Sequence, residues 1–213
     1  MKQKVIYICG RENLSEDAIF HAKLVAYLQS LQFCILEDSG AKMLKDRIPI
    51  AVMLLKHLGI FYLLRLLLHS SRTLLNRYQS KANVKKRISR LRIYLQLLDW
   101  DHIELYVLGR SAGAIVASRL AMEFPVKAVI ALGYPFIHPE YGMQSYRVEH
   151  LAHVKQEMYI FQGIRDEYGN PEMIKSIAMS SFVQIIPLDT DHAFALEGDK
   201  WEQFTSHLSS IIS

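Results

Sequence analysis

The sequence IELYVLGRSAGAIVASRLAMEF, residues 103–124, contains the clearest structural signal in the chain. Its first six residues are mostly apolar, as in a buried parallel strand, and they lead directly into the motif Gly109-x-Ser111-x-Gly113. A helix is expected from there to about Phe124, because Pro125 follows where helices commonly stop. A serine on a sharp turn between strand and helix needs small neighbours. The motif is therefore typical of an exposed nucleophile, although a glycine-rich turn without any chemistry has the same pattern.

Five other apolar runs predict strands, and they alternate with predicted helices. The expected strands are residues 4–9, 33–36, 127–132, 158–161 and 182–187. Helices are expected after residue 15, near 171–179 and at 201–212. This alternation favours an α/β fold with a doubly wound, mainly parallel six-stranded sheet. A length of 213 residues suits one domain, 1–213, with a helical insert at 41–80 after the second strand.

Two later segments supply partners for Ser111. Asp166 follows the fifth predicted strand and His192 follows the sixth, so each lies beyond the carboxyl end of a different strand, where open α/β sheets carry their sites. We predict Ser111 as nucleophile, His192 as its base and Asp166 as the acid that orients the imidazole. Asp189 and Asp191 are rival acids, but Asp191 directly precedes the histidine, which would give awkward geometry.

The three motifs resemble those of the α/β-hydrolases, in particular the small dienelactone-hydrolase-like branch. They are Gly-Arg-Ser-Ala-Gly-Ala at 109–114, Gln-Gly-x-x-Asp-x-x-Gly at 162–169 and Asp-His-x-Phe at 191–194. The resemblance covers residues 1–40 and 84–213. It implies a minimal α/β-hydrolase in which the first strand corresponds to the family's third, so that two edge strands are absent.

The resemblance also implies where substrate would bind. The segment Gly-Tyr134-Pro-Phe-Ile-His138-Pro is similar to a family segment beside the pocket, so Tyr134 and His138 are candidate pocket residues; a structural role in the loop is the alternative for His138. Family members often carry His-Gly-x-Gly after the first strand, where this chain has Cys9-Gly10-Arg11-Glu12. By position, the backbone N–H groups of Ala112 and Arg11 would form the oxyanion hole. Loss of one such donor typically lowers turnover by about 10²–10³.

These residues together predict a serine hydrolase that cleaves a carboxylic ester or thioester through an acyl-enzyme intermediate, with no cofactor. The partner would be a small-molecule ester or thioester, with an acyl-lipid as one candidate. The alternative is a non-catalytic α/β-hydrolase scaffold that binds a partner or a membrane surface through its basic, apolar insert. The intact set of three motifs argues against that alternative, whereas the altered oxyanion loop favours it.

Positive charge is concentrated in residues 41–98, which hold 13 Lys/Arg and one acid, a net +12, whereas the remainder carries −8. Within this segment, residues 48–68 form the longest apolar stretch and match the length of a membrane span, about 20 residues. A single span would place the two halves of one sheet on opposite sides of the membrane. We therefore expect a helical hairpin that forms an apolar cap over the site. Homodimer contact or peripheral membrane contact through 48–68 are the alternatives.

The segment after the insert is expected to be an amphipathic helix. Its apolar residues recur at helical spacing, at Val84, Ile88, Leu91, Leu95 and Leu98. The basic residues between them should be solvated: Lys85, Lys86, Arg87, Arg90 and Arg92. This run lacks interleaved aromatic residues, so it predicts no nucleic-acid binding. His150 and His153, with Glu149 beside them, are expected to be exposed polar helix residues, and no metal site is predicted.

The amino-terminal apolar run, Val5 to Cys9, is too short for the core of a signal peptide. Cys9 and Cys34 lie in strand-like runs and are expected to be buried free thiols, which fits a reducing compartment. The expected location is the cytoplasm, with peripheral contact to a membrane as the alternative.

Overall fold

The computed structural model describes residues 2–10, 18–37 and 81–213. The predicted insert at 41–80 and the oxyanion candidate Arg11 lie outside the described residues. The main strands are β1 (Gln3–Cys9), β2 (Cys34–Glu37), β3 (Ile103–Arg110), β4 (Ala128–Leu132), β7 (Glu157–Gly163) and β8 (Val183–Leu188). They form one sheet in the order β2-β1-β3-β4-β7-β8, in which every neighbouring pair is parallel. The predicted six-stranded parallel sheet is confirmed, and each strand lies within two residues of its expected bounds.

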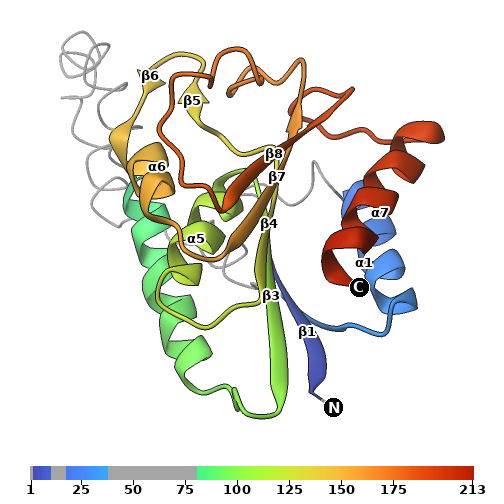
Figure 1. Cartoon of the computed structure of the whole chain (residues 1–213). Coiled ribbons are helices and arrows are strands. Elements are labelled where there is room, and N and C mark those ends of the chain that lie inside the picture. Colours follow the sequence, from blue (N-terminus) through green and yellow to red (C-terminus); the bar gives the residue numbers. More distant parts are fainter. Residues whose placement is uncertain (1, 11–17, 38–80) are drawn as a thin grey trace, which may run out of the picture.

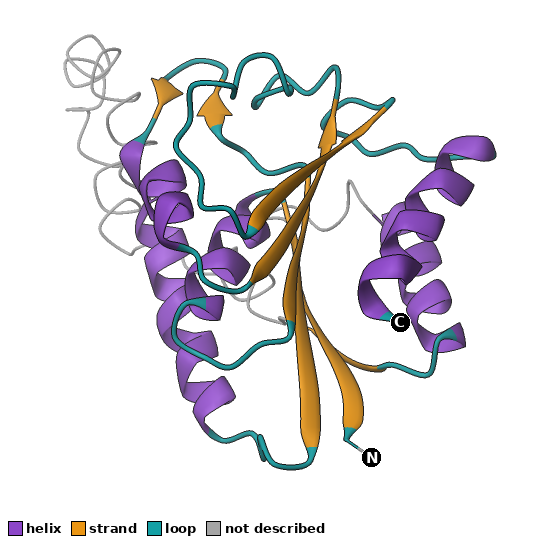
Figure 2. Cartoon of the chain, viewed as in Figure 1, coloured by secondary structure: helices purple, strands orange, loops and turns teal. Residues whose placement is uncertain are grey.

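Helices cover both faces of the sheet, which gives three layers (Figures 1 and 2). α1 (Ala18–Ser30) and α7 (Asp199–Ile212) lie on one face. The other face carries the helical residues 81–96, α5 (Ala112–Ala121), α6 (Ser145–Val148) and the 3₁₀ helix η2 (Glu149–His153). A short antiparallel ribbon, β5 (Ile137–His138) and β6 (Gly142–Met143), lies at the carboxyl-terminal edge of the sheet. Among the described helices, none is long and apolar enough to cross a membrane.

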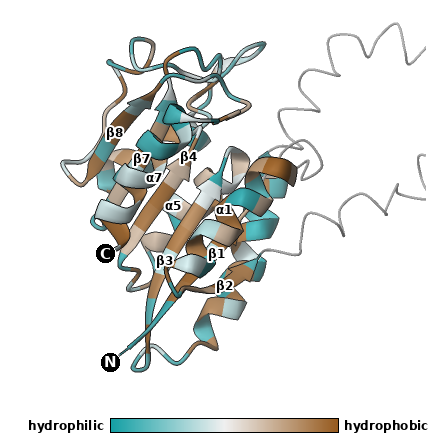
Figure 3. Ribbon diagram, turned by 90° about the vertical axis from the view of Figure 1, so that its right-hand side faces the viewer, coloured by the Kyte–Doolittle hydropathy of each residue, from teal (hydrophilic) through white to brown (hydrophobic). Residues whose placement is uncertain are grey.

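Side chains of the central strands alternate between the two faces of the sheet. In β1, Val5, Tyr7 and Cys9 pack into the core cluster that also contains α5. Ile6 and Ile8 of the same strand pack into the opposite cluster, with residues of α1 and α7. Because both faces are covered, the strands are apolar along their length, as their colouring in Figure 3 shows. This double burial is the reason that uninterrupted apolar runs predicted the strands.

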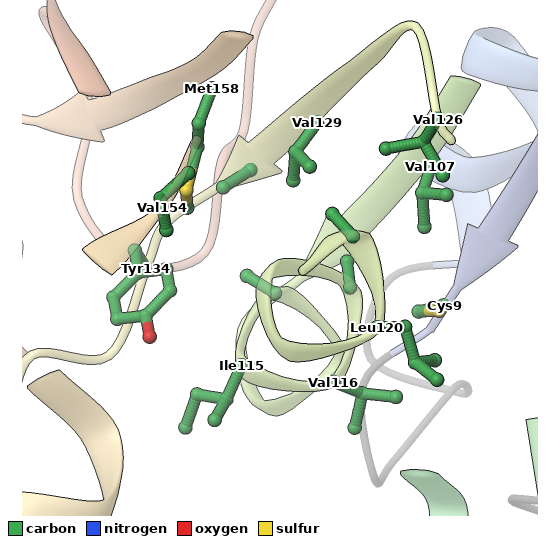
Figure 4. Packing of buried hydrophobic residues seen from close by; sticks show 14 of the residues in the cluster. Cys9, Val107, Ile115, Val116, Leu120, Val126, Val129, Tyr134, Val154 and Met158 are labelled. Carbon is green, nitrogen blue, oxygen red and sulfur yellow. The ribbon is translucent and has the colours of Figure 1, made fainter. Parts of the chain in front are cut away.

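Helix α5, which directly follows Ser111, is buried along most of its length. In Figure 4, Val107 and Val129 of the neighbouring strands lie on one side of the helix, whereas Ile115, Val116 and Leu120 extend from its other sides; all five belong to the same buried cluster. Burial of each large aliphatic side chain contributes about 1.5–3 kcal/mol. The amino-terminal end of the helix is therefore held firmly against the sheet beside Ser111.

The amphipathic helix expected after the insert is present, and Val84, Ile88, Leu91 and Leu95 of its apolar stripe are buried as predicted. Leu98 lies beyond the end of the helix and is half-buried. The expectation that Arg87 is solvated was wrong, since its side chain is only 4% exposed. One of its terminal nitrogens donates a hydrogen bond to the carbonyl of Gly10, at 2.9 Å. Position 87 lies three residues after Val84 and four before Leu91, so it belongs to the buried stripe of the helix.

The prediction of a helix near 171–179 was also wrong, because residues 171–176 form consecutive turns. The side chain of Asn170 accepts hydrogen bonds from the backbone N–H groups of Glu172 and Met173, both at 3.1 Å. The N–H of Ile177 then reaches only three residues back, to the carbonyl of Ile174, at 2.9 Å. Local side-chain and three-residue hydrogen bonds thus replace the helical ladder in this short connection.

A second serine–histidine contact lies inside the core, away from Ser111. His150, expected on an exposed helix face, is buried in η2, and its Nε2 lies 2.8 Å from Oγ of Ser118 in α5. Burial, with a smaller contribution from the positive charge of Arg119, lowers the pKa of His150 to about 3. The imidazole is therefore neutral at neutral pH.

The free energy of unfolding is expected to fall as the pH drops below about 6.5, in part because of His150. The unfolded histidine binds a proton near pH 6.5, whereas the folded one does so only near pH 3. The unfolded state thus binds more protons in this window, and the loss approaches about 1.4 kcal/mol per pH unit. Urea unfolding of wild type and His150→Gln between pH 7.5 and pH 4.5 measures this loss of unfolding free energy. In His150→Gln the free energy of unfolding should depend less on pH in this window. His153→Gln, which changes an exposed histidine nearby, is the control and should keep the pH dependence of wild type. Equal pH dependence in all three proteins would refute the assignment of this effect to His150.

Candidate active site

The turn between β3 and α5 holds Ser111 in a conformation that few residues adopt. Its φ of 52° and ψ of −122° are strained for a residue with a side chain. A Cβ at Gly113 would lie 2.0 Å from the carbonyl oxygen of Cys9, and one at Gly109 would lie 2.4 Å from Cα of Ala114. Both glycines are therefore required by the close approach of backbones. The motif is a tight strand–turn–helix junction, as the sequence predicts.

The structure brings Ser111, His192 and Asp166 together. Oγ of Ser111 lies 2.9 Å from Nε2 of His192. Nδ1 of the same imidazole lies 3.0 and 2.9 Å from the two carboxylate oxygens of Asp166. Asp166 is completely buried, His192 is 4% exposed, and Ser111 is half-buried. Three side chains from the carboxyl ends of three parallel strands thus form one continuous hydrogen-bonded chain.

The carboxylate of Asp166 is held by further contacts. One oxygen accepts a hydrogen bond from the backbone N–H of Tyr168, at 2.8 Å, and the other accepts one from the side-chain amide of Gln162, at 3.0 Å. The Gln162 amide nitrogen also donates to the carbonyl of Gly169, and its oxygen accepts from the N–H of Tyr134. This support was missed from the sequence, although Gln162 is the first residue of the motif that contains Asp166.

The two rival acids are engaged elsewhere. Asp189 forms exposed ion pairs with Arg165 and with Lys200, the latter at 2.8 Å. Hydrogen bonds from Lys200 and Arg165 lower the pKa of Asp189. Asp191 is exposed, and one of its oxygens accepts the backbone N–H of Ala193, at 2.9 Å. Asp166 is therefore the acid that meets the imidazole.

The predicted oxyanion donors are described only in part. Ala112 is the first residue of α5, where N–H groups have no acceptor within the helix and the helix dipole is positive. Its N–H belongs to the residue that follows Ser111, which is the usual place for such a donor. Arg11 lies outside the described residues, but Gly10 before it is anchored by the hydrogen bond from Arg87.

The two candidate pocket residues differ in their surroundings. Tyr134 is completely buried, and its hydroxyl donates to the backbone carbonyl of Arg147, at 2.5 Å. His138 is half-buried and stacks on Tyr141, with ring centroids 4.1 Å apart. Its ring also meets the edge of Tyr168, which in turn packs on His192 at 4.2 Å between centroids. His138 is thus linked to His192 through the ring of Tyr168, whereas Tyr134 packs in the buried core cluster.

No group of three or more His, Cys, Asp or Glu side chains placed to hold a metal ion occurs in the ranges that the structure describes. The side chains gathered at the carboxyl-terminal edge of the sheet comprise a hydroxyl, an imidazole and a carboxylate. This arrangement is chemically suited to proton transfer from a nucleophilic hydroxyl and to attack on a carbonyl carbon.

Comparison with solved structures finds the same fold at low sequence identity. An α/β serine hydrolase without a lid from Xanthomonas campestris is 14% identical, with a TM-score of 0.57 over 100% of this chain and 82% of that chain. An esterase from Pyrococcus furiosus is 12% identical, with a TM-score of 0.62 over 99% and 82%. A dienelactone hydrolase from Anabaena variabilis is 18% identical, with a TM-score of 0.54 over 98% and 84%. At these identities the matches establish the fold alone.

Sequence comparison identifies the family. A search of curated protein sequences finds no significant match. The family model described as alpha/beta hydrolase domain matches residues 72–213, two thirds of the chain, and this range includes Ser111, Asp166 and His192. The resemblance found in the three motifs is therefore confirmed at the level of the family. The chain belongs to the alpha/beta hydrolase domain family.

Proposed function

We propose that the protein is a serine hydrolase that cleaves a carboxylic ester or thioester through an acyl-enzyme intermediate. The observation that carries the proposal is the continuous contact from Oγ of Ser111 through the His192 imidazole to the Asp166 carboxylate. Membership of a hydrolase family and the likeness of the fold to that of an esterase add support.

In this mechanism His192 removes the proton of Ser111 while Oγ attacks the carbonyl carbon of the substrate. Asp166 accepts the hydrogen bond from Nδ1, holds the imidazole in the required tautomer and stabilises the imidazolium. The backbone N–H of Ala112 donates to the oxyanion, with Arg11 as the proposed second donor. Nε2 then protonates the leaving oxygen or sulfur, and the alcohol or thiol departs. His192 next deprotonates a water molecule, which attacks the acyl-enzyme; as the acyl C–Oγ bond breaks and the carboxylic acid leaves, Nε2 returns the proton to Oγ of Ser111.

The substrate is proposed to be a small-molecule ester or thioester, and an acyl-lipid is a candidate because of the apolar residues 48–68. These residues lie outside the described ranges, so the argument for an apolar acyl group rests on their composition. Each additional acyl methylene that is buried would contribute up to about 0.8 kcal/mol to binding.

Labelling with a fluorophosphonate probe tests the proposal. The folded wild type should be labelled at Ser111, as peptide mass mapping would show, because the probe requires a serine activated by a base. The same preparation should hydrolyse p-nitrophenyl esters within a panel from acetyl to decanoyl, or the corresponding acyl thioesters. A folded protein that is neither labelled nor active on either panel would favour the non-catalytic scaffold.

A further inference from the structure

A buried arginine lies directly beside the nucleophile. Arg110, the last residue of β3, is only 4% exposed. One terminal nitrogen donates to the carbonyl of Leu132, at 3.2 Å, and the other donates to the backbone carbonyl of His192. The side chain thus ties the ends of β3 and β4 to the loop that carries the imidazole. A hydrogen bond from a charged donor contributes more than one from a neutral donor, about twice as much.

The loop that Arg110 reaches contains a strained residue. Phe194 has a φ of 56°, which is unfavourable for a bulky side chain, and its ring is completely buried. The guanidinium carbon of Arg110 lies 4.8 Å from the centre of this ring. Residues held in such a conformation persist only when their surroundings fix them. Arg110 supplies two of these fixing contacts, one to the carbonyl of His192 and one to the ring of Phe194.

The end of β4 leaves room for the guanidinium. A Cβ at Gly133, where φ is 58°, would lie 2.8 Å from a terminal nitrogen of Arg110 and 3.1 Å from the ring of Phe194. The same point would lie 3.4 Å from a carboxylate oxygen of Asp166. The guanidinium is therefore packed between the end of β4, the strained loop and the buried acid.

We propose that Arg110 is a positioning residue, which holds the carbonyl of His192 and the turn at Phe194 so that Nε2 stays directed at Oγ of Ser111. This inference rests on the proposed hydrolase function. Arg110 does not act on the reacting atoms directly; it acts through the backbone of His192. Catalytic groups must stay within about 0.5 Å of their productive positions, and a misplacement of about 1 Å can lower the rate about 10²-fold.

Replacement of Arg110 by alanine, followed by addition of guanidinium ion, tests the proposal. Arg110→Ala should lower kcat for the best p-nitrophenyl ester about 10²-fold, with KM changed less than twofold. Guanidinium at millimolar concentration should restore kcat at least fivefold, because the ion fills the space and donates to the same carbonyls. The matched control is Arg119→Ala in α5, whose side chain donates to the carbonyl of Tyr146 at 2.6 Å. The control should keep its kcat and show no rescue.

Arg110→Lys is the second variant, for the case in which the alanine variant does not fold. Lysine keeps the charge but lacks the rigid fork whose two nitrogens reach the two carbonyls, so kcat should fall about tenfold while the thermal midpoint changes little. A kcat within twofold of wild type in any folded Arg110 variant would overturn the proposal. Loss of kcat that guanidinium does not restore in a folded Arg110→Ala would also overturn it. The hydrolase function would stand in both cases, because it is tested on the wild type.

Discussion

Ser111→Ala is expected to lower kcat for ester hydrolysis by about 10⁶-fold and to abolish fluorophosphonate labelling. The substitution removes the hydroxyl that lies 2.9 Å from the His192 imidazole and leaves the base without a nucleophile to activate. The residual rate above that in water, about 10³–10⁴-fold, would come from binding and from the oxyanion donors. Steady-state kinetics on the best p-nitrophenyl ester, together with gel fluorescence of the labelled protein, would measure both effects.

Ser118→Ala is the matched control for Ser111, because this buried serine also contacts a histidine, His150, at 2.8 Å. Its hydroxyl is completely buried in the core, so no substrate can reach it. The control should cost about 1–3 kcal/mol of stability through the unsatisfied imidazole and should keep both labelling and kcat. If labelling survived in Ser111→Ala and disappeared in Ser118→Ala, the nucleophile would be misassigned.

Asp166→Asn is expected to lower kcat by about 10⁴-fold while the fold is retained. The amide is similar in shape to the carboxylate, but it has one oxygen, so it keeps an acceptor for only one of the two donors, Gln162 or the N–H of Tyr168. The amide cannot balance the imidazolium charge, and its N–H group favours the wrong tautomer of His192. Rates at saturating ester concentration across pH 6–9 would measure the loss.

The rival acids provide the controls for this prediction. Asp189→Asn removes exposed ion pairs with Arg165 and Lys200, and such pairs contribute little to stability because water and salt screen them. Asp191→Asn keeps an oxygen that can accept the hydrogen bond from the backbone N–H of Ala193. Both variants should keep kcat within a few-fold of wild type. A larger loss in Asp191→Asn than in Asp166→Asn would show that the acid is assigned wrongly, without affecting Ser111.

The sheet and the gathered side chains at its edge were predictable from the sequence because each depends on local pattern. A parallel strand buried on both faces is a run of apolar residues, and β4, with all five residues buried, is an example. Parallel strands end at the same edge of the sheet. The proximity of residues that follow them, such as Asp166 and His192, can therefore be predicted without knowledge of the long-range contacts.

The features that sequence reasoning missed depend on contacts between distant segments. Arg87 is buried because the end of β1 offers it the carbonyl of Gly10, 77 residues away along the chain. His150 is buried because Ser118 in α5 lies across from it, 32 residues earlier. Tyr168 contacts His192 only through the packing of two loops. Residue type favours an exposed position for arginine and histidine, and tertiary structure overrides that preference here.

The position of β8 at the edge of the sheet has a consequence for the durability of the site. Among the described strands, β8 pairs only with β7. It contains Pro187, and every residue before its last one is half-buried or exposed. Local opening of such an edge costs less free energy than opening of the central strands. When β8 opens, the segment that carries His192 leaves with it, while Ser111 remains fixed between β3 and α5. The proposed base is therefore exposed to transient loss at temperatures where the nucleophile and most of the domain are still in place.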